Sequence, residues 1–365
     1  MILENIAQKL FAAQSVVLTT HRNCDGDGLG AQLALYHGLN KLGKSVRILN
    51  VDQPPAKYSF LEIEKWIEVY SAPLALEVSS APLALEVSTA SLAATDIALI
   101  FDTNDGRLVE PLFSDLKKKC KNVFFIDHHP VLLEGPAPTS GSFVDVGAAS
   151  TGEISYRLLK LLGVTLDAQI ARALYTSIAF DTQLFRYVKT DPASHMMAAE
   201  LLKYERHPEE IHRRLFATYT VERMALLSTA LSRVEYFAGN QLAFIGLRLK
   251  DFKDAHTSPG FDADDSADII DMVMNIESIE VAALIREDSP GHFKLSMRSK
   301  GAIEVVGMAE SFGGGGHRFA SGAYVNSDYD SLRARLRTEL QNSLETYLAS
   351  FAKDPTTALK QKAEK

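Results

Sequence analysis

The sequence has few of the features that mark a secreted or membrane protein. It contains only two cysteines, Cys24 and Cys120, so it cannot build a disulfide framework and nothing requires an oxidising compartment. No apolar run approaches the roughly 20 residues that span a bilayer. Glu4 interrupts the first apolar run, and neither a basic segment nor a small-residue cleavage site of a signal peptide is present. We therefore expect a cytoplasmic protein with no membrane partner.

The sequence is also short of positive charge. Lys and Arg number 38 against 46 Asp and Glu, which gives a net charge of −8. This balance argues against a protein that coats long duplex nucleic acid, although it leaves room for a local basic pocket that binds one or two phosphates. Hydrophobic residues make up 46% of the 365 residues and charged residues 23%, which are values typical of globular proteins. This length predicts two or three domains.

The first fifty residues predict a βαβ unit. A β-rich run at 15–20 leads into a polar, glycine-broken loop, then an apolar helical segment at 29–42, then a second β-rich run at 45–51. Such a unit implies a parallel sheet whose loops leave the carboxyl ends of the strands.

Two later strands place acidic residues at the same edge of that sheet. The apolar run at 96–101 ends at Asp102, and the run at 122–126 ends at Asp127. Ligands of open α/β sheets bind at the carboxyl ends of the strands. The pattern therefore predicts a ligand site at this edge.

The rest of the chain predicts further helices and a second α/β domain. Helices are expected at 150–162, 170–180 and, as one or two elements, 209–236; strands of a mixed or antiparallel sheet are expected at 241–249, 280–286 and 293–298. The predicted fold class is α/β, with a mainly parallel sheet flanked by helices in the first domain and a smaller mixed-sheet domain after a helical linker. The expected boundaries are a catalytic domain at 1–190, a helical linker at 191–238, a substrate-binding domain at 239–345 and a polar tail at 346–365.

A nine-residue segment is repeated in tandem between the predicted strands. The sequence SAPLALEVS occurs at 71–79 and again at 80–88. Two copies of this length are too few and too short for a solenoid. We interpret them as a local duplication in a surface connection, and a partner-binding element is the alternative.

The loop after the first strand contains one imidazole and two carboxylates, on His21, Asp25 and Asp27. Carboxylate oxygens suit hard divalent ions, and Mn²⁺ also accepts imidazole. Because Asp25 and Asp27 are two residues apart, their carboxylates could face different ions in an extended turn. A polar turn without a ligand is the alternative for this loop alone.

Further acidic and histidine residues follow other apolar segments. Asp102, Asp127 and Asp181 each end such a segment, and His128 and His129 follow Asp127 directly. Each aspartate alone would be explained as a helix cap or a turn residue. Together with the first loop, they supply the bridging carboxylate and the roughly three ligands per ion that two metals about 3.5–4 Å apart require.

A glycine run in the second domain predicts an anion-binding site. The glycines at 313–316 precede His317, and their backbone N–H groups could surround a phosphate. Arg298 ends a predicted strand and suits contact with a phosphate or a base edge. A flexible linker is the alternative, but the run lies between a helical segment and an apolar one. The predicted substrate-binding residues are Arg298, Ser299, Gly314, Gly315, Gly316 and His317.

At these residues the sequence resembles the DHH/DHHA1 phosphoesterase family, over roughly residues 10 to 330. The matching positions, in family order, are His21, Asp25 and Asp27, then Asp102, then Asp127-His128-His129, then Asp181, and finally the run GGGGHRFASG. Within the family, the second domain is most similar to that of the bacterial oligoribonuclease/pAp phosphatase (nanoRNase) branch. Cys24, Gln183 and Ser321 stand where the family usually has proline, glycine and alanine, and none of the three departures removes a ligand.

The resemblance implies a role for each matching residue. The implied ligands of one ion are His21, Asp25 and Asp102. The implied ligands of the other are Asp27, Asp102, His128 and Asp181, with Asp102 bridging. His129 would contact the scissile phosphate or assist the leaving oxygen, and Asp127 would orient the histidines. Arg298 and His317 would hold the terminal phosphate or base of the substrate.

The implied activity is that of a metal-dependent phosphodiesterase. Two divalent ions, with Mn²⁺ preferred and Mg²⁺ or Co²⁺ as alternatives, would activate a water molecule. The expected partners are short single-stranded RNAs of two to five nucleotides or linear dinucleotides such as pApA, which would yield nucleoside 5′-monophosphates. A pAp 3′-phosphatase and a cyclic-dinucleotide phosphodiesterase remain open, as do a non-catalytic nucleotide sensor and assembly into a homodimer.

Overall fold

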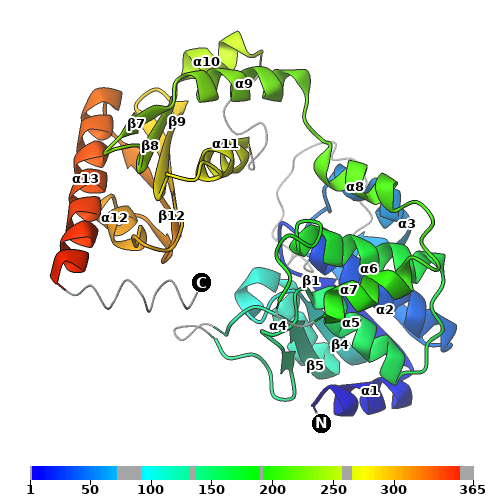
Figure 1. The fold of residues 1–365 in the computed structure, drawn as a ribbon. Helices are drawn as coiled ribbons and strands as arrows, with labels where there is room; N and C mark the ends of the chain where they lie inside the picture. Colours follow the sequence, from blue (N-terminus) through cyan, green and yellow to red (C-terminus); the bar gives the residue numbers. More distant parts are fainter. Residues whose placement is uncertain (1, 72–91, 132–135, 190–191, 257–264, 354–365) are drawn as a thin grey trace, which may run out of the picture. The chain divides into compact units, whose positions relative to one another are not determined.

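The structure is a computed structural model that describes residues 2–71, 92–131, 136–189, 192–256 and 265–353 (Figure 1). The chain divides into two units, Met1–Thr218 and Tyr219–Lys365. Within the described residues, no helix combines the length and the apolar character needed to cross a membrane.

The first unit is built on a six-stranded sheet in which every neighbouring pair of strands is parallel. Its strands are β1 (Ser15–Thr20), β2 (Ser45–Asn50), β3 (Ile67–Val69), β4 (Thr95–Phe101), β5 (Cys120–Asp127) and β6 (Phe143–Val144). The strand order is β3-β2-β1-β4-β5-β6, so the chain leaves β1 in one direction for β2 and later returns to the other side of β1 with β4. The carboxyl ends of β1 and β4 are therefore the point at which the strand order reverses.

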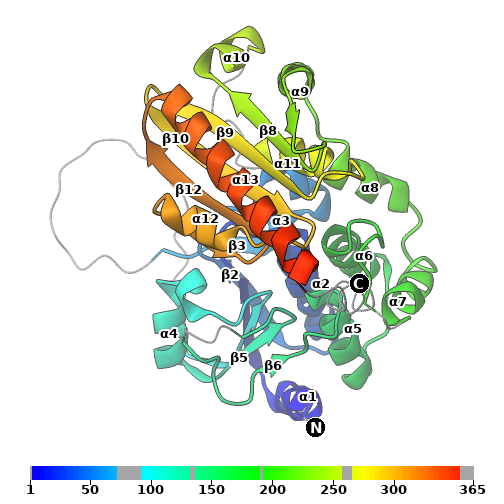
Figure 2. The same ribbon diagram turned by 60° about the vertical axis from the view of Figure 1, so that its left-hand side comes forward.

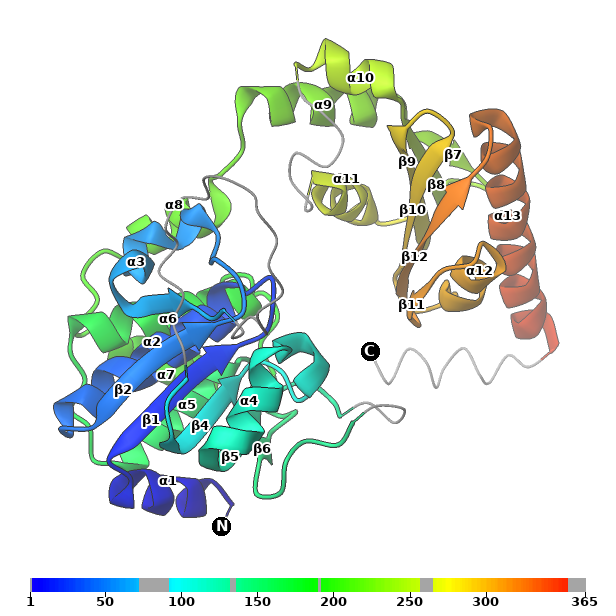
Figure 3. The same ribbon diagram turned by 180° about the vertical axis from the view of Figure 1, so that it is seen from behind.

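Helices cover both faces of this sheet, as Figure 3 shows from behind. They are α1 (Ile2–Ala12), α2 (Gly26–Lys41), η1 (Ala56–Leu61), α3 (Ile63–Trp66), η2 (Gly106–Val109), α4 (Leu112–Lys119), α5 (Thr151–Leu161), α6 (Ala168–Asp181), α7 (Ala193–Leu201) and α8 (Pro208–Phe216). Alternate residues of β4 explain the two layers. Leu99 packs in the core with α1, α2, α5 and α6, whereas Ile100 packs in the core with η2 and α4.

Side-chain caps fix the starts of the two helices nearest the strand ends. Asp25 caps α2, since its carboxylate accepts hydrogen bonds from the backbone of Asp27 and Gly28. Ser150 caps α5 by accepting from the backbone N–H of Glu153 at 3.2 Å. In a capping box, the side chain three residues into the helix also accepts from the backbone N–H of the capping residue. Here the Glu153 carboxylate accepts from the backbone N–H of Ala149, one residue before the cap Ser150.

The second unit contains a mixed sheet in the order β11-β12-β10-β9-β8-β7. Its strands are β7 (Glu235–Phe237), β8 (Leu242–Leu247), β9 (Val281–Ser289), β10 (His292–Ser299), β11 (Gly315–His317) and β12 (Ala320–Asn326). The β8–β9 pair is parallel and the other four pairs are antiparallel.

Helices also cover both faces of the second sheet, and Figure 2 shows α13 lying along it. They are α9 (Val221–Ser232), α10 (Leu249–Asp254), α11 (Asp265–Met274), α12 (Val306–Ser311) and α13 (Tyr329–Lys353). Phe244 of β8 packs with α12 and α13, and its neighbour Ile245 packs with α9, α10 and α11. The predicted α/β class, with a parallel first sheet and a mixed second sheet, is confirmed.

Two expected boundaries differ from the structure, and one strand was not expected. Residues 315–317, which begin within the glycine run, pair with β12 as strand β11. Residues 346–353, expected to begin a polar tail, continue α13, whose leucines at positions 340 and 344 are buried. The segment 191–238 is divided, with α7 and α8 in the first unit and α9 in the second. The tandem SAPLALEVS segment from residue 72 onward lies outside the described residues.

Candidate metal centre

The site forms where the strand order reverses, at the carboxyl ends of β1 and β4. His21 follows β1 directly and Asp102 follows β4, so the two side chains meet with His21 Nε2 3.4 Å from Asp102 Oδ2. Asp102 is buried and has a positive φ of 60°, a conformation that is strained for any residue other than glycine. The turn thereby directs a buried carboxylate across the end of the sheet.

Asp25 completes a first group with these two residues. One ligand atom each from His21, Asp25 and Asp102 lies within 4.8 Å of the others. Asp25 Oδ1 accepts from the backbone N–H of Asp27 at 2.9 Å, so the same carboxylate caps α2 and belongs to the group. The cap and the ligand interpretations of this aspartate are therefore compatible.

Three hydrogen bonds hold the carboxylate of Asp27. Its Oδ2 accepts from the backbone N–H of Thr151 at 2.7 Å, and its Oδ1 accepts from that of Gly152 at 3.1 Å and from the Ser177 hydroxyl. These donors come from the first turn of α5 and from α6, and the N-terminal end of a helix attracts negative charge. The carboxylate therefore has a fixed orientation.

His128 brings Asp27 together with two further carboxylates. Its Nε2 lies 3.6 Å from Asp27 Oδ2, 3.7 Å from Asp102 Oδ1 and 3.4 Å from Asp181 Oδ2. Nε2 is buried and has no hydrogen-bond partner among the described residues. A buried, unpaired imidazole nitrogen surrounded by three carboxylates fits a divalent cation.

Asp127 fixes both histidines without joining this ring of ligand atoms. Its Oδ1 accepts from the backbone N–H of His128 at 2.8 Å and lies 2.9 Å from His129 Nδ1. The Asn104 amide donates to Asp127 Oδ2 at 2.6 Å and to the carbonyl of His129 at 3.0 Å. The hydrogen bond to Asp127 raises the pKa of His129, which favours its protonated form.

The carboxylates of the site repel one another when no cation lies between them. Burial, followed by the charges of Asp27 and Asp25, raises the pKa of Asp102 well above its usual value. Burial raises the pKa of Asp27, and burial together with Asp27 and Asp25 raises the pKa of Asp181 to about 7. A cluster with these shifts is stabilised by bound positive charge, which is the electrostatic condition of a metal site.

The structure thus brings together all eight residues of the first unit that the sequence analysis singled out. Several supporting residues were missed. Thr151, Gly152 and Ser177 hold Asp27, Asn104 holds Asp127, and Asp52 accepts from the backbone of Asn23 at 2.6 Å. Of these, only Asn104 had a visible signal, since it follows a strand-ending aspartate in the sequence DTND.

Two family departures have clear structural settings. Cys24 is buried, and burial together with Asp52 and Asp25 raises the pKa of its thiol to about 12, so the thiol stays protonated and weakly reactive. Gln183, where the resemblance calls for glycine, has a φ of 47°. Glycine adopts that conformation without strain, which explains the family preference.

In the second unit, four of the predicted substrate-binding residues border a cavity of about 570 Å³. These are Arg298 and the glycines at 314–316, and Lys294, which was not predicted, lines the cavity with them. Ser299 is not one of the lining residues, and its hydroxyl accepts from the backbone of Gly301 at 3.3 Å. His317 is the last residue of β11. A side chain at position 314 or 316 would overlap the backbone of β12, so these two glycines permit the close pairing of β11.

Comparisons with known proteins agree with both units. The model of the DHH family N-terminal domain matches residues 15–178, and that of the DHHA1 domain matches residues 244–346. The bifunctional oligoribonuclease and PAP phosphatase NrnA of Thermus thermophilus is 31% identical over 93% of this chain and 93% of its own length. The chain belongs to the DHH family. The protein of the same name from Bacillus subtilis is 25% identical to this DHH protein over 89% of the chain and 94% of its own length.

Solved structures show the same fold. An exopolyphosphatase-related protein from Bacteroides fragilis superposes with this DHH protein at a TM-score of 0.74 and 21% identity, covering 95% of this chain and 96% of the other. The exonuclease RecJ, in a structure bound to manganese, gives a TM-score of 0.52 at 14% identity, covering 93% and 94%. The resemblance to DHH/DHHA1 proteins that was seen in the sequence is confirmed.

Proposed function

We propose that the first unit binds two divalent cations through two groups that share Asp102. The first group is His21, Asp25 and Asp102. The second is Asp27, Asp102, His128 and Asp181. The three carboxylates around the unpaired Nε2 of His128 carry this proposal. Two imidazoles among mostly carboxylate ligands favour Mn²⁺ over Mg²⁺ or Ca²⁺, and Co²⁺ is the closest substitute.

We further propose that this DHH protein is a phosphodiesterase that hydrolyses short oligoribonucleotides or linear dinucleotides to nucleoside 5′-monophosphates. When bound, two divalent ions lower the pKa of water and neutralise charge on a phosphoryl group. The protein's net negative charge, together with one local cavity lined by Arg298 and Lys294, favours a short substrate over a long duplex. Relatives that match over nine-tenths of their length bear the name of an oligoribonuclease.

The chain's own residues supply the remaining chemistry. The N–H groups of Thr151 and Gly152 keep Asp27 oriented, and Asp127 keeps the ring of His129 fixed. Because Asp127 stabilises the protonated ring, His129 can donate a proton from Nε2 to the departing oxygen or a hydrogen bond to a phosphoryl oxygen. The side chain of His129 is 55% exposed, so a substrate can reach it.

A 3′-phosphatase activity on pAp is the second candidate, and the same site would perform it. The names of the matching relatives join the two activities in one protein. The proposed metal groups of the first unit would act on a phosphate ester, and they suit a phosphodiester and a terminal monoester equally.

Product analysis on a substrate panel tests both activities. The panel holds pAp, pApA, 5′-phosphorylated RNAs of increasing length and cyclic dinucleotides, each with Mn²⁺ and with chelator. We expect release of 5′-monophosphates from the shortest RNAs and the linear dinucleotide in Mn²⁺ alone. Full activity in chelator after dialysis would contradict the metal assignment, and a preference for long RNAs would contradict the substrate assignment.

A further inference from the structure

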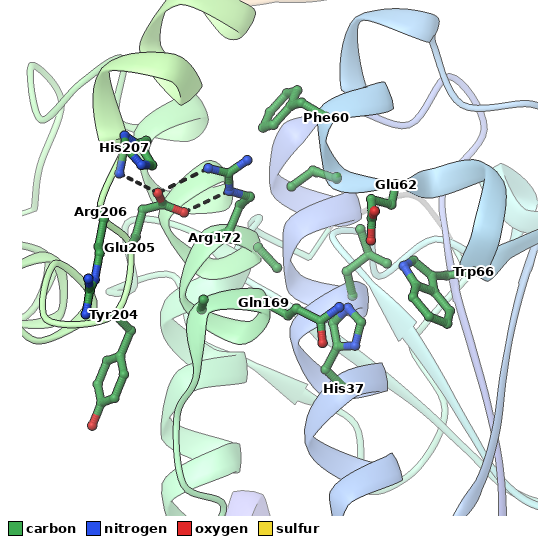
Figure 4. Close-up of a pocket in the computed structure, with 14 residues that line it drawn as sticks. His37, Phe60, Glu62, Trp66, Gln169, Arg172, Tyr204, Glu205, Arg206 and His207 are labelled. Carbon is green, nitrogen blue, oxygen red and sulfur yellow. Dashed lines mark hydrogen bonds and ion pairs between the residues drawn. The ribbon is translucent and has the colours of Figure 1, made fainter.

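The first unit contains a cavity that is separate from the metal centre. It has a volume of about 420 Å³ and lies between α2, α6, the η1–α3 segment and the connection from α7 to α8 (Figure 4). Its wall on α2 includes His37, which lies about 15 Å along the helix from Asp27 at a rise of about 1.5 Å per residue. None of the residues assigned to the metal centre lines it.

Aromatic and apolar side chains form most of one wall. The rings of His37 and Trp66 meet edge to face with centroids 5.5 Å apart, and Phe60 stands at the opposite rim in Figure 4. Leu33 and Leu61 also line the cavity. Such a surface favours a flat, apolar-faced ligand over an extended polar one.

Three side chains on the same wall carry polar groups. The indole Nε1 of Trp66 is buried and has no hydrogen-bond partner among the described residues. Gln169 projects its amide beside His37 in Figure 4 and offers both a donor and an acceptor. Burial lowers the pKa of His37, so that ring is neutral at pH 7 and adds one donor and one acceptor. Paired donors and acceptors next to aromatic rings match the edge and face of a heterocyclic base.

Most of the charged groups around the cavity already satisfy one another, and Arg206, which also lines it, is exposed to solvent. Arg172 donates to Glu205 at 2.8 and 3.2 Å and to Glu210 at 3.1 Å, and the backbone of His207 donates to Glu205 at 2.7 Å. Glu62 pairs with Lys65. A ligand therefore gains little from carrying a charge into the cavity, since no lone interior charge awaits a counter-ion.

We propose that this cavity binds an uncharged nucleobase-bearing ligand, a purine nucleoside, with the base against Trp66 and His37 and its edge at the Gln169 amide. A cavity of this size accommodates the base together with its ribose. This inference goes beyond the proposed hydrolysis, because the site lies at a distance from the metal centre and needs neither metal nor turnover.

The single tryptophan of the chain provides a local readout, because Trp66 is the only indole. The full chain in excess chelator is titrated with adenosine, and indole emission is followed with excitation at the red edge of the band. We expect saturable quenching with a dissociation constant on the order of 0.1 mM, the affinity that an efficient ligand of this size reaches. Ribose alone and a plain aromatic alcohol should not produce saturable quenching of the indole emission.

Variants locate the binding. Gln169→Leu keeps the side-chain volume at an exposed position and should weaken adenosine binding about tenfold. Gln14→Leu, the same change at an exposed glutamine that does not line the cavity, should leave binding unchanged. Arg298→Ala should also leave the titration unchanged, which separates this site from the cavity of the second unit.

Three results would overturn the proposal. The first is the absence of saturable quenching by any purine nucleoside. The second is equal quenching by the aromatic alcohol, which would show an unspecific apolar pocket. The third is equal affinity of the parent and Gln169→Leu. Because no step uses metal or hydrolysis, these outcomes are independent of whether the phosphodiesterase proposal holds.

Discussion

At the scale of single residues, Asp102 has two opposed effects. Its carboxylate is shared by both proposed metal groups, yet without a cation it is buried beside other carboxylates on a strained backbone. A residue that a function requires can thus lower the stability of the empty fold.

Replacing Asp102 with asparagine separates these effects. Asp102→Asn should lower turnover at least about 100-fold because it removes a shared ligand charge. The metal-free protein should become more stable by roughly 1 kcal/mol because a repelled, buried charge is gone. Kinetics in Mn²⁺ and urea unfolding in chelator measure the two quantities. The control is Asp328→Asn, an exposed helix cap of the second unit that should change neither. Turnover within tenfold of the parent would contradict the shared role.

Asp181 predicts how stability depends on pH. Its pKa rises from 3.8 to about 7 in the folded, metal-free site, so between these values the folded state keeps a proton that the unfolded chain releases. Stability of the metal-free protein should therefore fall as pH rises through this range. Asp181→Asn should remove this part of the slope in denaturant unfolding at several pH values. Identical slopes for parent and variant would contradict the assigned pKa shift.

At the scale of elements, the packing of α5 against α6 positions Asp27. A Cβ at Gly152 would overlap the side chain of Ser177, which also holds Asp27. Gly152→Ala should therefore displace the first turn of α5 and weaken Mn²⁺ binding by about tenfold or more. Calorimetric titration measures the affinity. The control is Gly307→Ala in α12, where nothing lies within 4 Å of the added carbon and affinity should not change. Unchanged affinity in Gly152→Ala would mean that α5 does not set the carboxylate.

Elements with strong local patterns could be predicted from the sequence, and those defined by partners could not. The apolar runs of β1 and β4 and the loop after β1 pointed to the proposed ligand residues because each carries its signal locally. The strand β11 was missed, since its glycines form a strand only through close pairing with β12. The helix α13 was not predicted either, although its sequence carries a local pattern. Leucines recur every fourth residue at 332, 336, 340 and 344, and all four are buried.

The same distinction holds for the site. Each proposed ligand lies at the end of a strand or at an end of a helix, so its role could be inferred from its place in the sequence pattern. The residues that hold the ligands could not, because their contacts join distant segments. Ser177 reaches Asp27 across 150 positions, and no pattern near either residue indicates that contact.

At the scale of the whole molecule, the two units should contribute separately to a reaction on nucleotides. If Arg298 binds one end of the substrate, Arg298→Ala removes a charge-assisted contact worth roughly 1.5–3 kcal/mol. It should then lower kcat/KM on a dinucleotide about ten- to a hundredfold. A small generic phosphodiester should be hydrolysed as well as by the parent. Arg213→Ala, an exposed arginine of the first unit, serves as the control. Equal losses on both substrates would show that Arg298 supports the fold or the chemistry instead.

The strand order of the first sheet has a consequence for how the protein is made. The proposed metal ligands lie at the ends of β1, β4 and β5, at the start of α2 and at the end of α6, so they span residues 21 to 181. A growing chain on the ribosome has released His21, Asp25 and Asp27 long before Asp181 emerges. The N-terminal part of the nascent chain therefore exposes a partial set of chelating groups that cannot yet enclose an ion. With the proposed ligands, a cation could be enclosed only after about half of the polypeptide has been synthesised, and only then could it stabilise the new fold.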